Sequence, residues 1–237
     1  MAKNENVKPL ITVDKPKSVI SEKFRGIRTN TLFSTADNDV QTVVFTSEKP
    51  SSGKSTISAN VAITYAQAGY KTLLIDGDMR KPTQHYMFNT SNIDGLSNLI
   101  INKTDYSKAI HKTDIAGLDL LTAGPIPPNP SELIGSENLL EIFQYVKKEY
   151  DFIIIDTPPV NTVTDAQLLS GIAQYVVLIV DVQKNDRNAV KKGKELIEKA
   201  GAKILGVVLN KAPEDKSSSY YYYYGKDEKW STSIIMF

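Results

Sequence analysis

A ten-residue segment, SEKPSSGKST at positions 47–56, lies between an apolar run and a stretch of helix-forming residues. The apolar run, Thr42–Thr46, predicts a buried strand, and Lys54–Ala68 predicts a helix. A strand, a loop that ends in Gly-Lys-Ser and a helix form the arrangement that holds nucleotide phosphates. Glu48 replaces the usual first glycine of such a loop, so only the Gly-Lys-Ser end fits. We expect a phosphate-binding loop here, and the alternative is an ordinary strand-to-helix turn with a solvated lysine.

The residues of this loop have separate predicted roles. Gly53 lets the backbone approach a phosphate, Lys54 reaches the β- and γ-phosphate oxygens, and the Ser55 hydroxyl binds Mg²⁺. Backbone amides at the start of the helix point at the β-phosphate. The residues expected to contact the nucleotide are Ser51, Ser52, Gly53, Lys54, Ser55 and Thr56.

Short β-branched runs alternate with longer amphipathic stretches, which is typical of a parallel sheet with crossover helices. The predicted strands are Thr42–Thr46, Thr72–Asp76, Leu118–Thr122, Phe152–Asp156, Tyr175–Val182 and Ile204–Asn210. The predicted helices are Ser18–Phe33, Lys54–Ala68, Ser136–Glu149, Asp165–Ile172 and Arg187–Ala200, with a shorter one near Ser131. Several strands are apolar at consecutive positions, as expected of strands buried on both faces. We therefore expect the α/β class, with a single doubly wound, mostly parallel sheet flanked by helices.

Two of these strands end in carboxylates, at the edge where a doubly wound sheet binds its ligand. Asp76 and Asp78 follow one strand, and Asp156 ends another. Three buried acids would repel one another unless a cation neutralised them. Mg²⁺ with ATP supplies such a cation, and we expect Ser55, Asp78 and Asp156 to hold it. For Asp156 alone, the alternative is a turn or helix-capping aspartate.

The composition of the chain narrows the classes of function. The 237 residues carry 28 lysines and arginines against 27 acidic residues, a net charge of +1, which argues against a nucleic-acid partner. Without cysteine, the sequence offers no disulfide, thiolate metal site or cysteine nucleophile. No segment approaches the roughly 20 apolar residues of a membrane span, and the N-terminus lacks the apolar core of a signal peptide. We expect a cytoplasmic protein.

Three segments are expected along the chain: an N-terminal extension at 1–17, a nucleotide-binding domain at 18–212 and a mobile tail at 213–237. The tail contains five adjacent tyrosines, Tyr220, Tyr221, Tyr222, Tyr223 and Tyr224. Five neighbouring side chains cannot all face one core in a helix or a strand, so most of these rings must be exposed. Nothing in the sequence explains the apolar residues that end the tail.

These residues together resemble the bacterial tyrosine kinases of capsule and exopolysaccharide synthesis, in particular the CapB-like cytoplasmic kinases of Gram-positive bacteria. The resemblance runs from residues 22–30 through the phosphate loop, Leu73–Arg80, Gly124–Leu133 and Ile153–Pro159 to the tyrosine run. It implies a phosphate-loop fold like that of the MinD and ParA ATPases. The sequence has no His-Arg-Asp or Asp-Phe-Gly motif of the eukaryotic protein kinases. Family members usually carry glycine at the position of Ser51.

The resemblance implies ATP-dependent phosphorylation of protein tyrosines, including phosphorylation of Tyr220–Tyr224 in trans, and regulation of capsule or exopolysaccharide synthesis. It also implies a ring-shaped homo-oligomer packed through Glu22, Arg25 and Arg28, for which the alternative is an exposed helix with intrahelical ion pairs. A separate membrane protein would activate the kinase through a cytoplasmic segment and recruit it to the inner face of the membrane. Each phosphate adds about −1.5 to −2 charges, so we expect phosphorylated tails to repel one another and break the ring.

Within this mechanism, Lys54 stabilises charge on the transferred phosphate, while Asp78 and Asp156 hold Mg²⁺. Asp76 accepts or orients the tyrosine proton, because a phenol with a pKa of about 10 is otherwise a poor nucleophile. Asp76 and Asp78 could exchange these roles.

Two further residues take their predicted roles from the related MinD and ParA ATPases. Lys49 occupies the place of their signature lysine, which reaches the nucleotide of a neighbouring subunit; a solvated loop lysine is the alternative. Asn210, at the end of the last predicted strand, is a candidate adenine contact or an ordinary turn residue.

A second function remains open, that of a MinD- or ParA-like ATPase that switches with its nucleotide and has no kinase activity. Its membrane-bound form would need a basic amphipathic C-terminal helix, and its DNA-bound form would need a basic surface. The sequence shows neither feature. A third function, an adaptor whose tail another kinase phosphorylates, leaves the carboxylates beside the phosphate loop unexplained.

Overall fold

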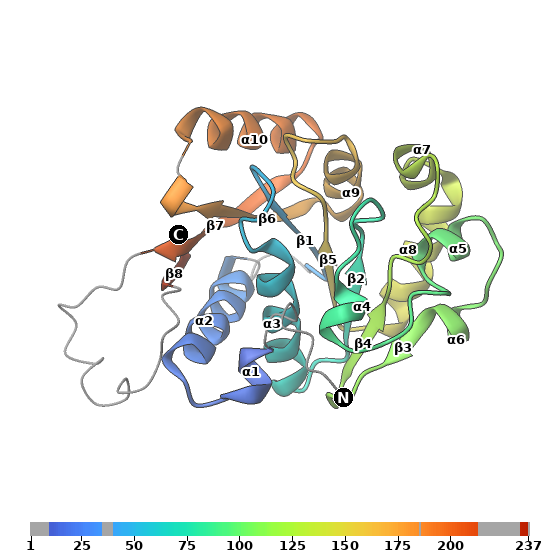
Figure 1. Cartoon of the computed structure of the whole chain (residues 1–237), viewed down its shortest axis with the longest axis horizontal. Coiled ribbons are helices and arrows are strands. Elements are labelled where there is room, and N and C mark those ends of the chain that lie inside the picture. Colours follow the sequence, from blue (N-terminus) through green and yellow to red (C-terminus); the bar gives the residue numbers. More distant parts are fainter. Residues whose placement is uncertain (1–9, 35–39, 185, 213–232, 237) are drawn as a thin grey trace.

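The computed structural model describes residues 10–34, 40–184, 186–212 and 233–236, which form one sheet between two layers of helices (Figure 1). The strands are β1 Thr42–Ser47, β2 Thr72–Asp76, β3 Ile110–Lys112, β4 Leu118–Leu121, β5 Phe152–Asp156, β6 Tyr175–Asp181, β7 Lys203–Ala212 and β8 Ser233–Met236. The longer helices are α2 Val19–Ser34, α3 Lys54–Gln67, α8 Glu137–Glu149, α9 Asp165–Ala173 and α10 Arg187–Lys199. The short helices are α1 Ile11–Asp14, α4 Gln84–Met87, α5 Leu96–Ile100, α6 Tyr106–Ala109 and α7 Pro130–Ile134, with a 3₁₀ turn, η1, at Val182–Lys184.

The strand order across the sheet is β3-β4-β2-β5-β1-β6-β7-β8. The six inner strands are parallel, while β3 and β8 pair antiparallel at the two edges. From β1 the chain passes through α3, on one face of the sheet, to β2. From β5 it passes through α9, on the other face, to β6, which lies in the opposite direction along the sheet. This reversal opens a crevice at the carboxyl ends of β1 and β5, where doubly wound sheets bind ligands.

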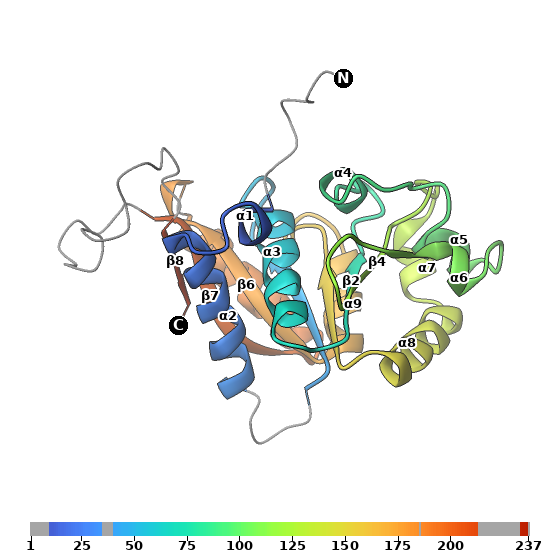
Figure 2. The same ribbon diagram turned by 90° about the horizontal axis from the view of Figure 1, so that it is seen from below.

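Each inner strand contributes alternate side chains to two hydrophobic cores, because successive residues of a strand point to opposite faces. Along β5, Ile153 and Ile155 pack with α5, α7, α8, α9 and α10, whereas Phe152 and Ile154 pack with α1, α2 and α3. Figure 2, seen from below, shows α1, α2 and α3 covering the near face of the sheet. The expected doubly wound α/β sheet, buried on both faces, is confirmed.

The six predicted strands and five longer predicted helices are all present, and β2 and β5 have the predicted bounds. The two antiparallel edge strands were not predicted. The three residues of β3 are all partly exposed, so they show no apolar pattern. Strand β8 lies in the expected tail, where Ser233–Met236 pairs with β7. Four residues of the expected mobile tail therefore form an edge strand.

Part of the expected N-terminal extension contacts the rest of the described chain. Helix α1 lies within it, and the Ile11 side chain is buried in the same core as α2 and α3. The backbone amide and the hydroxyl of Thr12 both donate to the Asn60 Oδ1 atom of α3, at 3.0 and 2.9 Å. Residues 11 and 12 of the expected extension thus pack against the nucleotide-binding domain.

Tyr220–Tyr224 lie outside the described residues. Among the helices that the structure describes, none is both long enough and apolar enough to span a bilayer.

Candidate active site

The loop between β1 and α3 turns through two left-handed residues before the helix begins at Lys54. Ser51 has a φ of 65° and Gly53 a φ of 94°, a region that glycine adopts readily and serine rarely. A Cβ on Gly53 would lie 2.2 Å from the Nδ2 atom of Asn210, so no other residue fits here without displacement. The loop therefore has the compact, left-handed geometry expected of a phosphate cradle.

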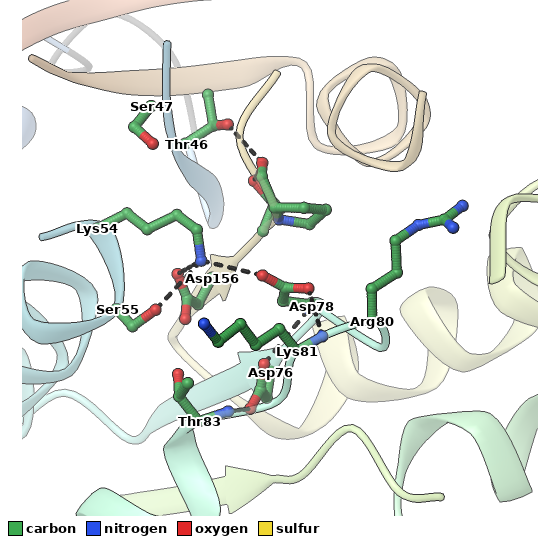
Figure 3. A network of polar contacts seen from close by, with 12 residues as sticks. Thr46, Ser47, Lys54, Ser55, Asp76, Asp78, Arg80, Lys81, Thr83 and Asp156 are labelled. Atoms are coloured by element: carbon green, nitrogen blue, oxygen red, sulfur yellow. Dashed lines mark hydrogen bonds and ion pairs between the residues drawn. The ribbon is translucent and has the colours of Figure 1, made fainter. Parts of the chain in front are cut away.

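Lys54 extends from the first turn of α3 into a group of carboxylates (Figure 3). Its ammonium nitrogen lies 3.2 Å from Asp78 Oδ2, 3.6 Å from Asp156 Oδ1 and 3.2 Å from the Ser55 hydroxyl. Burial lowers the pKa of Lys54, but three nearby carboxylates, led by that of Asp156, outweigh burial and raise the pKa above its ordinary value. Lys54 therefore stays charged and neutralises part of the acidic cluster.

Asp156, the last residue of β5, is fully buried beneath this lysine. Its Oδ2 atom accepts a hydrogen bond from the Gln84 amide at 2.8 Å, while Oδ1 accepts none. Burial raises the pKa of Asp156, although Lys54 and the side chains of Ser55 and Gln84 oppose the rise. The Lys54 ammonium, 3.6 Å from Oδ1, offsets part of the cost of burial, and a metal cation near Oδ1 would offset more.

Asp76, which we predicted to accept or orient the tyrosine proton, is not among the residues that line the cleft, and this role stays a prediction. Its side chain is fully buried and accepts backbone amides from Asp78 at 3.3 Å and from Thr83 and Gln84 at 2.9 Å each. Burial raises the pKa of Asp76 to about 7, the Asp156 carboxylate adds to the rise, and the backbone amides of Gln84 and Thr83 oppose it. Asp76 thus anchors the chain from residue 78 to the start of α4.

Asp78 is also buried, but it lies at the cleft, a difference from Asp76 that the sequence could not show. One carboxylate oxygen pairs with Lys54, and the other accepts the Lys81 backbone amide at 3.0 Å. Asp78 lines the cleft together with Lys54 and Ser55. Of Asp76, which ends β2, and Asp78, which follows this strand, only Asp78 therefore lines the cleft.

The cleft has a volume of about 510 Å³ and opens beside the phosphate loop. Its walls come from the loop and α3, from the segment between β2 and α4, and from the segment after β5. The lining residues are Pro50, Ser51, Gly53, Lys54, Ser55, Thr56, Asp78, Arg80, Lys81, Thr83, Tyr86, Met87, Pro158, Pro159, Thr162 and Val163. The lining mixes charged and hydroxyl side chains with apolar groups, among them those of Tyr86 and Met87 of α4 and of Val163.

Gln84 is a site residue that the sequence did not reveal. The buried side chain donates to the Asp156 carboxylate at 2.8 Å and to the Ser55 backbone carbonyl at 3.1 Å. It therefore joins the end of β5 to the first turn of α3. A polar residue in a four-residue helix produces no periodic pattern, so nothing in the sequence marked it.

Arg80 connects the cleft to α7 and α9. Its guanidinium lies 2.8 and 3.1 Å from the two oxygens of the buried Asp165 and donates to the Ser131 hydroxyl at 2.9 Å. These two-pronged hydrogen bonds of the guanidinium hold the segment after β2 against α7 and α9.

The residues near the loop fit one Mg²⁺ ion. Ser55 and Asp156 offer hard oxygen ligands, and Asp156 Oδ1 lacks a hydrogen-bond partner. Within the part of the chain that the structure describes, no three His, Cys, Asp or Glu side chains are grouped to hold a metal. The protein would thus supply a few ligands, and phosphate oxygens and water would supply the others.

The remaining predicted nucleotide contacts lie around the loop. Ser52 is fully buried, and the buried hydroxyl of Thr56 has no hydrogen-bond partner. Asn210 donates from Nδ2 to the Ser52 carbonyl at 2.8 Å, so its amide contacts the loop itself. The Lys49 ammonium donates to the Lys184 carbonyl and lies 3.2 Å from Glu48. The proposed reach of Lys49 to a neighbouring subunit and the adenine contact of Asn210 stay predictions.

The three residues of the predicted oligomer interface lie on α2. Arg25 pairs with Glu22 at 2.5 Å and donates to the Pro16 carbonyl at 2.7 Å. Arg28 donates to the Thr64 carbonyl of α3 at 2.7 Å. Arg28 thus supports the packing of its own subunit, and Glu22 is the most exposed of the three residues.

Comparisons with known proteins agree with this architecture. The AAA domain family model matches residues 40–204. The putative tyrosine-protein kinase CapB of Staphylococcus aureus is 61% identical over 225 residues, covering 95% of this chain and 99% of that protein. The crystal structure of the chimerical protein CapA2B2 superposes with a TM-score of 0.84 at 59% identity, covering 86% of this chain and 90% of that one.

A more distant likeness concerns the fold alone. The septum site-determining protein MinD of Pyrococcus horikoshii, complexed with Mg-ADP, gives a TM-score of 0.61 at 22% identity, covering 76% of this chain and 72% of that one. The expected MinD-like phosphate-loop fold is confirmed. Because the high identity to the staphylococcal protein extends over nearly the whole of both chains, the chain belongs to the family of bacterial tyrosine kinases.

Proposed function

We propose that this chain is an ATP-dependent protein-tyrosine kinase that phosphorylates its own C-terminal tyrosines and regulates capsule or exopolysaccharide synthesis. The observation that carries the proposal is the cleft in which Lys54 and two carboxylates meet beside the phosphate loop. The tyrosine kinase named in the staphylococcal relative supports the choice of acceptor.

In the proposed reaction the loop amides hold the β-phosphate and Lys54 neutralises charge that develops on the γ-phosphate oxygens. Ser55 and Asp156 would hold Mg²⁺, with Asp78 close enough to contribute. When bound, the ion supplies further positive charge to the transferred group. Gln84 fixes the Asp156 carboxylate and the first turn of α3 relative to each other.

The acceptor tyrosine would enter the cleft, where apolar groups of the lining residues Tyr86, Met87 and Val163 suit a phenol ring. The phenol oxygen attacks the γ-phosphorus, and the bond from that phosphorus to the β–γ bridging oxygen breaks. Asp78 takes or orients the phenol proton, since Asp76 is enclosed by backbone amides. The sequence left open whether Asp76 or Asp78 takes this role, and here we assign it to Asp78.

Assembly would bring the acceptor tyrosines to the cleft. A ring-shaped homo-oligomer packed through α2, with Glu22, Arg25 and Arg28, would present each tail to a neighbour, so that Tyr220–Tyr224 are phosphorylated in trans. Five phosphates would then repel one another and separate the subunits. A membrane protein would activate the kinase through its cytoplasmic segment and recruit it from the cytoplasm to the inner membrane face. The chimerical structure named CapA2B2 supports a partner chain of this kind.

The test is incubation of the purified chain with Mg-ATP, followed by mass spectrometry of phosphotyrosine, with Lys54→Met as the matched inactive chain. We expect phosphotyrosine in the intact chain and none in Lys54→Met. ADP release without phosphotyrosine would favour the MinD- or ParA-like switch ATPase. Equal phosphate on the Lys54→Met chain would reveal a contaminating kinase and remove the support for this cleft.

A further inference from the structure

Two residues at the end of β7, Asn210 and Lys211, hold the phosphate loop by its backbone carbonyls. Asn210 Nδ2 donates to the Ser52 carbonyl at 2.8 Å, and the Lys211 ammonium donates to the Ser51 carbonyl at 2.9 Å. Neither residue lines the cleft, although Ser51 and Gly53 do. The two side chains therefore contact the loop without lining the cleft.

The Asn210 side chain is fixed in one orientation by two different partners. Its Oδ1 atom accepts the Lys211 backbone amide at 2.9 Å, and its Nδ2 atom donates to the loop. The side chain is buried, so exchanging oxygen and nitrogen would set like groups against both partners. It also fills the space beside Gly53, where a Cβ would lie 2.2 Å from Nδ2. Asn210 thus sets the loop's position at Ser52 and Gly53.

Lys211 is fixed just as firmly. Its backbone is left-handed, with a φ of 60°, and its ammonium pairs with Asp181 at 2.7 Å. The Asp181 carboxylate, at the end of β6, is almost fully buried. The ammonium is therefore held between a buried carboxylate on β6 and the carbonyl of Ser51, which is itself left-handed with a φ of 65°.

The geometry of the peptide bond connects these carbonyls to phosphate binding. Every described peptide bond is trans, so the carbonyl of one residue and the amide hydrogen of the next point in opposite directions. Holding the carbonyls of Ser51 and Ser52 toward β7 therefore directs the amides of Ser52 and Gly53 away from it. Those amides belong to the loop that would hold the β-phosphate.

We propose that Asn210 and Lys211 are positioning residues that preorganise the phosphate-binding amides, and that Lys211 compensates for a serine at the left-handed position 51. Without this hold, Ser51 would relax toward a negative φ and turn the amide of Ser52 away from the phosphate. Glycine at position 51 would need no such support, because it adopts a positive φ readily. The inference rests on the proposed nucleotide site and adds a reason for its geometry.

The test is a double-mutant cycle in which ADP affinity is measured by calorimetry in the presence of Mg²⁺. We expect Lys211→Met to raise the ADP dissociation constant about fivefold in the Ser51 chain, as a free-energy change near 1 kcal/mol would. In a Ser51→Gly chain the same substitution should raise it less than about twofold, because the two residues are coupled. Lys203→Met, at the exposed opposite end of β7, is the matched control and should leave ADP affinity unchanged.

A second pair of chains guards against misfolding, since Lys211→Met leaves the Asp181 carboxylate buried without its cation. This pair carries Asp181→Asn together with Lys211→Met, with and without Ser51→Gly, and we expect the same coupling. Equal losses in the serine and glycine chains would overturn the proposal, because Lys211 would then act on the nucleotide without involving Ser51. Unchanged affinity would overturn it too, while leaving the proposed kinase intact. If the unmodified chain did not bind ADP, both the proposed nucleotide site and this inference would be wrong.

Discussion

Gln84 connects three residues of the proposed active site by hydrogen bonds. Its amide bonds the Asp156 carboxylate and the Ser55 carbonyl, while its backbone amide donates to Asp76. We expect Gln84→Leu to lower the rate of tyrosine phosphorylation about tenfold, as loss of a group that orients a metal ligand commonly does. The backbone bond to Asp76 remains in this variant, so α4 should keep its place. The measurement is the rate of phosphotyrosine formation at saturating Mg-ATP.

The control for this substitution is Gln144→Leu, which makes the same chemical change on the exposed face of α8. Its phosphorylation rate should match that of the intact chain. If the Gln84→Leu chain phosphorylated tyrosine at the normal rate, the link from Gln84 to Asp156 would have no role in the reaction.

Arg80 and Asp165 should contribute unequally to stability, because they differ in burial. The Asp165 side chain is fully buried, whereas 41% of the Arg80 side chain is exposed. Arg80→Met leaves a buried carboxylate without its cation and should lower the free energy of unfolding by about 1–3 kcal/mol. Asp165→Asn leaves a guanidinium that water can reach, so it should lower the free energy of unfolding by less than Arg80→Met does. Urea unfolding of both variants measures the two losses, and the reverse order would contradict this account.

The three carboxylates of the site could be predicted because parallel strands bring their carboxyl ends to one edge of the sheet. The difference between Asp76 and Asp78 could not. It depends on backbone amides of residues 78, 83 and 84, which converge on Asp76 only once the chain after β2 has folded back. The contact of Asn210 with the loop was likewise hidden, because it joins residues 158 positions apart.

Among the elements, those buried on both sides were predicted best. The apolar runs of β2 and β5 predicted their bounds correctly, because central parallel strands exclude polar residues from both faces. Helices of four or five residues, such as α4, are too short to show a 3.6-residue period. The edge strand β3 has partly exposed residues on both faces, so its pattern resembles that of a loop.

Helix α10 offers a test of stability at the level of one element. The Asp186 side chain accepts the backbone amides of Asn188 and Ala189 at 3.0 and 3.1 Å, which caps the start of the helix. Asp186→Ala should lower the free energy of unfolding by about 1 kcal/mol, whereas Asp186→Asn, which caps as well, should change it little. Urea unfolding provides both values. Equal losses in the two variants would show that the charge of Asp186, rather than its hydrogen bonds, stabilises α10.

At the scale of the whole molecule, the proposed ring depends on the exposed face of α2. Glu22→Ala combined with Arg25→Ala should reduce the oligomer to monomers, because both side chains would be lost from the contact between subunits. Arg28 is left in place, since its bond to the Thr64 carbonyl supports the subunit itself. Light scattering measures the mass, and Asn30→Ala, on an exposed position of the same helix, is the control. An unchanged mass in the double variant, or a monomeric intact chain, would contradict the proposed ring.

In the proposed function, the nucleotide cleft of one chain phosphorylates the tyrosines of another. The most direct test of this mechanism mixes two variants of the chain with Mg-ATP. The first carries Lys54→Met and keeps Tyr220–Tyr224. The second keeps Lys54 and has these five tyrosines replaced by phenylalanine. Mass spectrometry then maps phosphate on each chain. The account predicts phosphotyrosine at residues 220–224 of the Lys54→Met chain only when the second chain is present. Consumption of ATP by the mixture without phosphate on those tyrosines would contradict it.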